Sequence, residues 1–359
     1  MLKKSLTKII FVNFLVFLIS ILIIEIFFGH YFSGHSFGPY MREHRMKKIP
    51  VNFWYKGTEY NYIYKRNYHG FRGEEIDPAQ IEAVMIGGST TDERYKPIEF
   101  SIAENLNVLL KKNGYNFRII NAGIEGQSTY GHIHNFKNWF PKLKNFSPKL
   151  YIFYIGLNDY SFEPDKDEYS NYESDGNLMN AEAIEVFFDT LKSNSFFYDK
   201  LRILKQKYYS TAKTVKYYHD SEKLKDLKYI DYKQALELHD VEKLKLKHQI
   251  VISKYLNRVK ILNSFVTKKN STAVFINQVL ATGNKNEKLF ILNYSLIEYC
   301  KDTNMYCIDL AAKLNGKYDY WWDKHHTTGQ GSKVVAETVI KDLIKIIKLE
   351  NLFGAGEGN

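Results

Sequence analysis

Four short segments of the chain carry residues that could do chemistry together. In the first, residues 86–91, an apolar run ends in two glycines followed by Ser89. A serine between a strand and a helix projects at the carboxyl edge of a sheet, where the backbone N–H groups of the next turn can stabilise negative charge. Ser89 is therefore a candidate nucleophile. The competing interpretation is an ordinary strand–helix turn with a helix-capping serine.

A second segment, residues 321–331, places Asp323 three positions before His326. An aspartate so placed can accept the Nδ1–H of the imidazole and leave Nε2 to take a proton from a serine. The spacing Asp-x-x-His arises by chance about once in a chain of this length. The catalytic interpretation is supported by the position of this segment after the last predicted strand, at the same sheet edge as Ser89.

The other two segments hold donors for an oxyanion. Gly126 follows the second predicted strand, in residues 121–126, and Asn158 follows the third, in residues 156–159. A tetrahedral oxyanion needs donors about 2.7–3.1 Å from its oxygen, and a glycine N–H and an asparagine amide can supply them. The alternative for each segment is a turn glycine or an Asx turn.

The predicted elements that position these segments alternate between strand and helix. Short apolar runs bounded by turn residues predict five strands, at residues 83–86, 117–120, 150–155, 273–276 and 306–310. Helical spacing predicts helices at residues 102–112, 133–143, 287–301 and 332–348. The alternation indicates βαβ units and hence a flavodoxin-like three-layer α/β/α fold with a five-stranded parallel sheet, whose ligands lie beyond the carboxyl ends of the strands.

An N-terminal apolar segment predicts a transmembrane helix. Residues 9–28 are almost all apolar, and about 20 residues at ~1.5 Å rise cross a hydrocarbon core of ~30 Å. Lysines precede the segment, so the positive-inside rule predicts a cytoplasmic N-terminus and a periplasmic or extracellular remainder. A cleaved signal peptide is the competing interpretation, but its apolar region is shorter and no small-x-small site follows. We expect a single-pass protein of the inner (cytoplasmic) membrane.

The predicted organisation has four parts. Residues 1–29 form a cytoplasmic tip and transmembrane anchor, 30–80 an irregular stalk and lead-in segment, 81–350 the α/β domain, and 351–359 a disordered tail. Residues from about 162 to 262 have helical patterns without strand-like runs and predict a helical insertion between the third and fourth strands. It is either a lid or partner surface or a solvated helical hairpin with no role in chemistry.

Composition and charge exclude several classes of protein. With 45% hydrophobic and 25% charged residues, the chain is globular rather than collagen-like, disordered or multi-spanning. The net charge of +10 comes from dispersed lysines without a recognition motif, so we expect no nucleic-acid partner; an anionic membrane or glycan suits such a field better.

The two cysteines and a histidine pair allow narrower statements. Two cysteines exclude a disulfide-framework domain and a multi-cysteine zinc module. Cys300 and Cys307 either pair, as an exported domain permits, or are small buried apolar side chains. His132 and His134 lie two apart in a helical segment and face different directions, so we expect no metal site there.

In chain order, the four segments resemble those of the SGNH (GDSL-type) hydrolase family, in its membrane-anchored bacterial form. The likeness covers about residues 67–345, including a lead-in segment at 67–73 in which Arg72 is expected to make a structural pairing. The resemblance implies a catalytic triad and an oxyanion hole. The triad is Ser89, Asp323 and His326, and the oxyanion donors are the Ser89 N–H, the Gly126 N–H and the Asn158 side chain.

Two details of the resemblance concern neighbouring residues. His326 is favoured over His325 because the family spacing is Asp-x-x-His and its later glycine matches Gly331. Gly88 stands where the family's Gly-Asp-Ser has an aspartate, so the hydrogen bonding beside the nucleophile is expected to differ.

The resemblance implies a membrane-anchored extracytoplasmic serine esterase that works through an acyl-enzyme without metal or organic cofactor. The expected substrate is O-acetylated cell-surface carbohydrate, because the anchor would hold the site beside the envelope. The alternatives are an O-acyltransferase on a surface glycan, a lysophospholipase or thioesterase, and a non-catalytic glycan- or partner-binding protein. Trp321 and Trp322 either floor a sugar or acyl pocket or pack the last helix.

Overall fold

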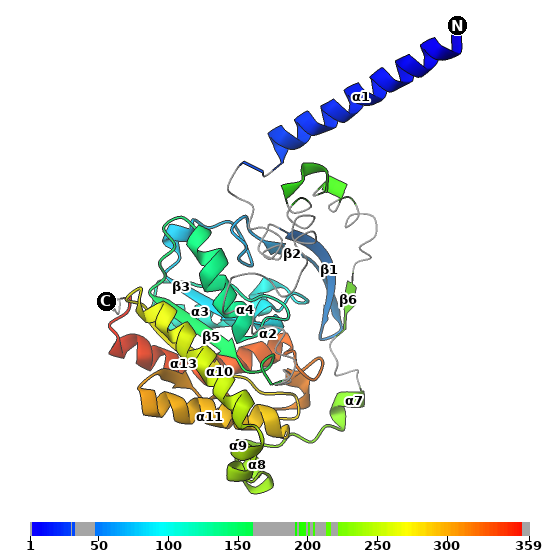
Figure 1. The fold of residues 1–359 in the computed structure, drawn as a ribbon. Coiled ribbons are helices and arrows are strands. Elements are labelled where there is room, and N and C mark those ends of the chain that lie inside the picture. The colour runs from blue at the N-terminus through cyan, green and yellow to red at the C-terminus, as the bar shows by residue number, and fades with distance from the viewer. Residues whose placement is uncertain are drawn as a thin grey trace. The chain divides into compact units, whose positions relative to one another are not determined.

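The computed structural model describes residues 2–29, 31–32, 47–160, 191, 194–198, 200–201, 204, 213–216 and 222–353 of the chain (Figure 1). Residues Met1–Arg42 and Asn177–Thr211 form one unit, and Glu43–Gly176 and Ala212–Asn359 form a second. The first unit contains α1 (Leu2–Phe28), in which Lys8–Phe28 has a mean hydropathy of 2.9 and is 0% buried. By length and composition this helix is able to cross a membrane, and a signal sequence has the same properties.

Glu25, near the end of α1, holds the second segment of its unit. Its carboxylate accepts hydrogen bonds from Ser195 Oγ at 2.5 Å and from the backbone N–H groups of Phe196 at 2.8 Å and Phe197 at 3.2 Å. Ser195 Oγ in turn accepts from the N–H of Tyr198 at 3.0 Å, as an N-cap does. The carboxylate that interrupts the apolar segment therefore satisfies the free donors at the start of a helical turn.

The second unit is built on a five-stranded, all-parallel sheet in the order β4-β3-β5-β7-β8. The strands are β3 (Ala83–Gly87), β4 (Ile119–Asn121), β5 (Leu150–Ile155), β7 (Thr272–Asn277) and β8 (Tyr306–Ile308). Every residue of β3, β5 and β7 is buried, as expected for central strands covered on both faces. Numbered along the chain, the strand order is 2-1-3-4-5, and the predicted flavodoxin-like sheet is confirmed.

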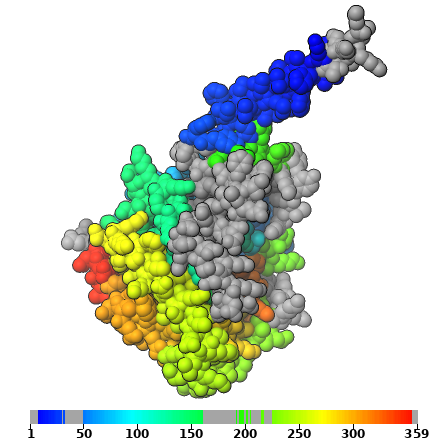
Figure 2. Space-filling view, in the orientation of Figure 1, coloured from blue at the N-terminus to red at the C-terminus, as the bar shows by residue number. Residues whose placement is uncertain are grey.

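Alternate residues of each strand face two different helical layers. Ile152 and Tyr154 of β5 belong to the core cluster that includes α3 (Ile102–Lys112) and α13 (Gly329–Leu349), which pack on each other. Tyr151 and Phe153 instead meet the ring of Phe136, which follows α4 (Thr129–His134). On that second face α10 (Gln249–Thr267) contacts both α4 and α11 (Glu287–Thr303) (Figure 2). The second unit therefore has the three layers that the sequence predicts.

A β-hairpin replaces the irregular stalk expected before the first strand of the main sheet. It consists of β1 (Lys47–Tyr55) and β2 (Thr58–Arg66), which are antiparallel. Lys56 and Gly57 join them with φ of 48° and 79°, the left-handed values that tight hairpin turns use. Val51 and Phe53 of β1 point into the core with 2% of their surface exposed. This inward alternation lies among aromatic and basic residues, which hid it from the sequence analysis.

The predicted insertion at 162–262 also differs from expectation. Within it, β6 (Lys213–Val215) pairs in parallel with β1, although no strand was expected there. The helices that follow are α7 (Glu222–Lys225), α8 (Tyr232–Leu238), α9 (Val241–Lys247) and α10. Because α10 covers the sheet, it belongs to the three-layer core. Most of residues 161–221 lie outside the described residues, and the domain boundaries stay predictions.

At the end of the chain, the predicted disordered tail is partly ordered. Phe353 stacks on Phe117 with ring centroids 3.7 Å apart, so residues 351–353 pack on the domain. Residues 354–359 of that tail lie outside the described residues.

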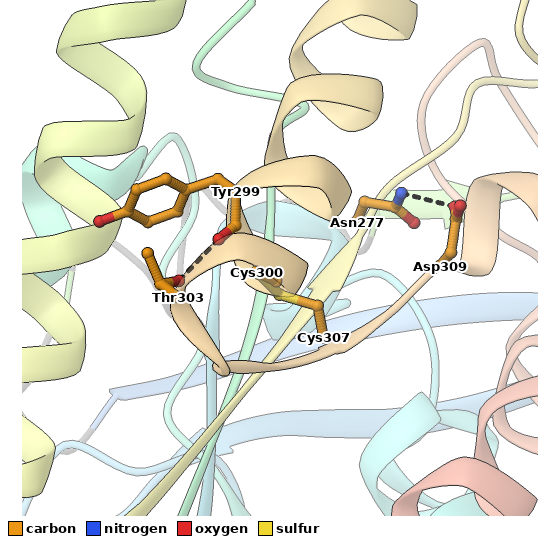
Figure 3. Close-up of a disulfide and its surroundings, with 6 residues drawn as sticks. All are labelled: Asn277, Tyr299, Cys300, Thr303, Cys307 and Asp309. Carbon is orange, nitrogen blue, oxygen red and sulfur yellow. Dashed lines mark hydrogen bonds between the residues drawn. A yellow bond between two sulfur atoms is a disulfide. The ribbon is translucent and has the colours of Figure 1, made fainter.

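Cys300 and Cys307 are joined in a disulfide, so the structure has the first of the two alternatives (Figure 3). Their Cα atoms are 6.1 Å apart, within the usual range for a disulfide. Asn304, with φ of 53°, ends α11 and turns the chain back into β8, which brings the two cysteines together. The disulfide therefore ties the end of a covering helix to an edge strand.

Candidate active site

Ser89 lies at the sharp turn between β3 and α2 (Ser89–Asp92), at the carboxyl edge of the sheet. The Gly88 carbonyl accepts from the N–H groups of Thr91 and Asp92 at 3.0 and 2.9 Å, and the Ser89 carbonyl accepts from the N–H of Glu93 at 2.8 Å. Glu93 has φ of 48°, so α2 stops after one turn. The turn holds a half-buried serine in a fixed orientation.

The structure brings Ser89, His326 and Asp323 into one hydrogen-bonded chain. His326 Nε2 lies 2.8 Å from Ser89 Oγ, and its Nδ1 lies 2.6 Å from Asp323 Oδ2. The other oxygen, Oδ1, accepts from the backbone N–H groups of His325 and His326 at 2.7 Å each. Burial raises the pKa of Asp323, but the bond to His326, its charge and the two N–H donors outweigh burial, and the pKa stays below its usual value. The aspartate is thus an anion that orients the imidazole.

The other predicted oxyanion donors lie beside these three hydrogen-bonded residues. Asn158 Nδ2 donates to the Gln127 carbonyl at 2.7 Å, so the Asn158 side chain and the loop that carries Gly126 are adjacent. Gly126 has φ of 79°, which favours glycine there. Among the described residues, the backbone N–H groups of Ser89 and Gly126 have no acceptor. The structure therefore places the Asn158 amide between the nucleophile turn and the loop that carries Gly126.

Gly88, the departure from the family's Gly-Asp-Ser, has a steric reason. A Cβ at this position would lie 2.2 Å from Asn158 Nδ2 and 2.9 Å from the Gln127 carbonyl oxygen. Neither separation is possible for non-bonded atoms, so any larger residue has to displace the Asn158 amide or the loop. The glycine lets the amide lie directly over the nucleophile turn.

Two buried side chains fix the turn that carries Asn158, and the sequence analysis missed both. Gln278, just after β7, accepts from the Leu157 N–H at 2.7 Å and donates to Thr90 of α2 at 2.7 Å. Arg258 of α10 pairs with the Asp159 carboxylate at 3.2 Å, with their side chains 4% and 1% exposed. A buried charge with a partner on a facing element is visible only once the fold is known.

A buried ion pair links the nucleophile turn to the histidine loop. Lys96 Nζ lies 2.6 Å from Glu93 Oε1, from the Thr327 carbonyl and from Ser332 Oγ. Burial lowers the pKa of Lys96, and the Glu93 carboxylate opposes that change. Because Thr327 directly follows His326, this ammonium joins both sides of the site. In the sequence, the only sign of this ion pair is that Glu93 and Lys96 lie close to Ser89.

The lead-in hairpin is bonded to the same turn. Arg66 Nη1 lies 3.0 Å from Asp92 Oδ1, and Tyr64 donates to that oxygen at 2.5 Å. Arg72 donates to the carbonyls of Asp92 and Lys96, at 2.5 Å each. Arg72 thus makes the structural pairing expected of it, with backbone acceptors.

A cavity opens beside Ser89 and His326. Its volume is about 20 Å³, and the empty space rises to about 470 Å³ when the open mouth is included. Trp322 forms part of the wall, with its ring 5.7 Å from that of Tyr95 and 5.5 Å from that of His326. Trp321 is 1% exposed and packs in the core. Trp322 therefore fits the interpretation as a pocket wall, and Trp321 fits the interpretation as a packing residue.

The histidine pair in α4 is buried. Burial lowers the pKa of His132 and of His134 to about 4 each, so both are neutral at pH 7. Among the residues that the structure describes, no group of three or more His, Cys, Asp and Glu side chains is arranged to hold a metal ion.

The sequence profile of the GDSL-like lipase/acylhydrolase family matches residues 82–339. The chain belongs to this family. The match runs from the start of β3 into α13 and so includes all five strands of the parallel sheet. The earlier resemblance is therefore confirmed at the level of the family.

Solved structures of lipases and esterases are similar to this chain at low identity. A GDSL-like lipase from Bacteroides thetaiotaomicron has 12% identity and a TM-score of 0.36, with 76% of this chain and 92% of that chain covered. An acetylxylan esterase from Geobacillus stearothermophilus has 12% identity and a TM-score of 0.41, covering 74% and 96%. A psychrotrophic esterase from Pseudoalteromonas sp. has 11% identity and a TM-score of 0.41, covering 74% and 99%. No curated protein sequence matches the chain significantly.

Proposed function

We propose that this family member is a serine esterase, with Ser89 as nucleophile, His326 as general base and acid, and Asp323 as the group that orients the histidine. The observation that carries the proposal is the continuous hydrogen-bonded chain from Asp323 through His326 to Ser89. Both distances suit proton transfer without rearrangement.

The reaction follows from these positions. Ser89 Oγ attacks the ester carbonyl while His326 Nε2 takes the hydroxyl proton, and the carbonyl π electrons move to oxygen. The N–H groups of Ser89 and Gly126 and the Asn158 amide stabilise that oxyanion. The oxyanion then re-forms the carbonyl, the ester C–O bond breaks, and His326 gives its proton to the departing alkoxide. Water repeats the sequence on the acyl-enzyme, which releases the acid and restores the serine.

The proposed substrate is an O-acetylated carbohydrate of the cell surface. The apolar helix α1 supports a membrane-anchored site facing the envelope, on the periplasmic or extracellular side. The mouth of the cavity carries an exposed Lys216 and an ion pair between Arg94 and Glu125 at 2.5 Å. A polar, charged mouth suits a hydroxyl-rich alcohol better than a lipid tail.

Fluorophosphonate labelling of the full chain in detergent micelles tests the catalytic assignment. We expect label on Ser89, none on the Ser89→Ala variant, and a rate on the order of 10⁴-fold lower for His326→Ala. His325→Ala is the matched control, because that neighbouring imidazole does not bond the serine, and its labelling should stay at the wild-type rate. Equal labelling of wild type and His326→Ala would refute the proposed site.

A further inference from the structure

The small sheet β2-β1-β6 supplies one wall of the cavity beside Ser89. Phe53 of β1 and Val215 of β6 line it, and these two residues are partners in the parallel register of the two strands. We propose that Phe53 and Val215 set the size limit of the acyl pocket and restrict this enzyme to acetyl esters. The inference rests on the proposed esterase function and assigns a role to β6.

The size of the cavity supports a two-carbon acyl group. The positions that the centre of a water-sized group can occupy in this cavity fill only about 20 Å³, so its enclosed part holds a small group. A methyl group is of similar size to a water, and a longer acyl chain has to extend along the wall that Phe53 and Val215 form. The acyl group takes the enclosed part, and the alcohol part occupies the open mouth, where the empty space is far larger.

The wall is held in place by bonds to the nucleophile turn. Phe53 is 2% exposed and packs against Phe100 with ring centroids 5.7 Å apart. Tyr62 of β2 donates to the Arg94 carbonyl at 2.9 Å, beside the ion pair of Arg66 and Asp92. A pocket closed by side chains on a bonded sheet discriminates by length more sharply than one closed by a free loop, because its wall yields less.

Val215 comes from a strand far along the chain from the rest of this wall. It is 9% exposed and joins the main hydrophobic core. Residue 215 lies inside the insertion predicted at 162–262, for which the sequence allowed either a lid or partner surface or a helical hairpin with no role in chemistry. At least one residue of this predicted insertion, Val215, therefore forms part of the cavity wall.

The test is the chain-length profile of the full chain on 4-nitrophenyl acetate, butyrate and hexanoate. For the wild type, we expect kcat/KM to fall by about 10-fold or more per step, since one added methylene in a filled pocket is worth about 10–200-fold. Val215→Ala should raise the butyrate-to-acetate ratio of kcat/KM by about 10-fold. Val51→Ala is the matched control, because Val51 is a buried valine of the same sheet that does not line the cavity.

The outcomes separate this proposal from the proposed function. A wild type that is not labelled by fluorophosphonate and turns over no ester overturns the proposed function. A labelled wild type that cleaves hexanoate as fast as acetate, or a Val215→Ala profile equal to that of Val51→Ala, overturns only the pocket assignment. If Val215→Ala fails to fold, Phe53→Leu shortens the wall from the other strand, and an unchanged ratio there overturns the assignment as well.

Discussion

Replacing Gly88 by alanine should disable the oxyanion donor of Asn158 without touching any reacting group. The added Cβ would lie 2.2 Å from Asn158 Nδ2, more than 1 Å inside ordinary contact, so the amide has to move away from the serine. Loss of one oxyanion donor costs about 2.7–4 kcal/mol, or about 10²–10³ in kcat. We therefore expect kcat of Gly88→Ala to fall by about 10²–10³, with KM changed by less than about threefold because the donor acts mainly in the transition state.

A double-mutant cycle tests the cause of that loss. Asn158→Ala should lose a similar factor, and adding Gly88→Ala to it should cost little more, because the clashing amide is already gone. Independent effects would instead multiply to about 10⁴–10⁶. The assay is hydrolysis of 4-nitrophenyl acetate under saturation, with circular dichroism to verify folding and Leu343→Ala, a core substitution in α13, as the control for destabilisation alone. Near-wild-type kcat in Gly88→Ala, or multiplied losses in the double variant, would refute the reasoning.

Three further predictions concern stability and location. Lys96→Met should lower the free energy of unfolding, measured in urea, by about 3–5 kcal/mol, because it leaves the buried Glu93 carboxylate without its cation. The double variant Glu93→Gln/Lys96→Met should recover most of that loss. Equal stability of the single and double variants would contradict the prediction. Burial lowers the pKa of His132 to about 4, below its value of about 6.5 in an unfolded chain. The unfolded state therefore binds more protons, and the free energy of unfolding should fall as pH drops from about 6.5 to 4, by about 1.4 kcal/mol per pH unit for this group. His132→Gln should flatten the plot of unfolding free energy against pH, and an unchanged slope counts against the prediction. Because Lys8–Phe28 of α1 is strongly apolar and 0% buried, the full chain should stay in the membrane after carbonate extraction, and release into the supernatant would exclude an uncleaved anchor.

The main sheet was predictable because its central strands are buried on both faces and read as unbroken apolar runs. The segment that became β5 is six residues long and wholly buried, and turn residues bound it on both sides. The hairpin was missed for the opposite reason. Most of β2 is exposed and polar, and only the alternation of Tyr64 and Arg66 toward the domain marks it as a strand. The inward Arg66 is stable there because Asp92 and the carbonyls of Gly70 and Gly123 accept its hydrogen bonds. Asp92 and Gly123 come from other parts of the sequence.

The candidate site was predictable to the extent that it is local in sequence. Asp323 and His326 are three residues apart, so one loop sets their geometry. Ser89 could be found because it comes directly after a recognisable strand. The partners that hold this geometry are not local. Lys96 contacts Thr327 more than two hundred positions away, and Val215 reaches the cavity only through strand pairing. Sequence spacing carries no information about such contacts.

The pairing of β6 with β1 has a consequence for the order of folding. The two strands meet over three residue pairs, Val51 with Lys213 through Phe53 with Val215. Some 160 positions separate them, so a long loop has to close for a very short ladder. The ladder therefore forms after the five-stranded sheet and opens before it, through local fluctuation. The amides of residues 213–215 should then exchange with solvent before those of β5.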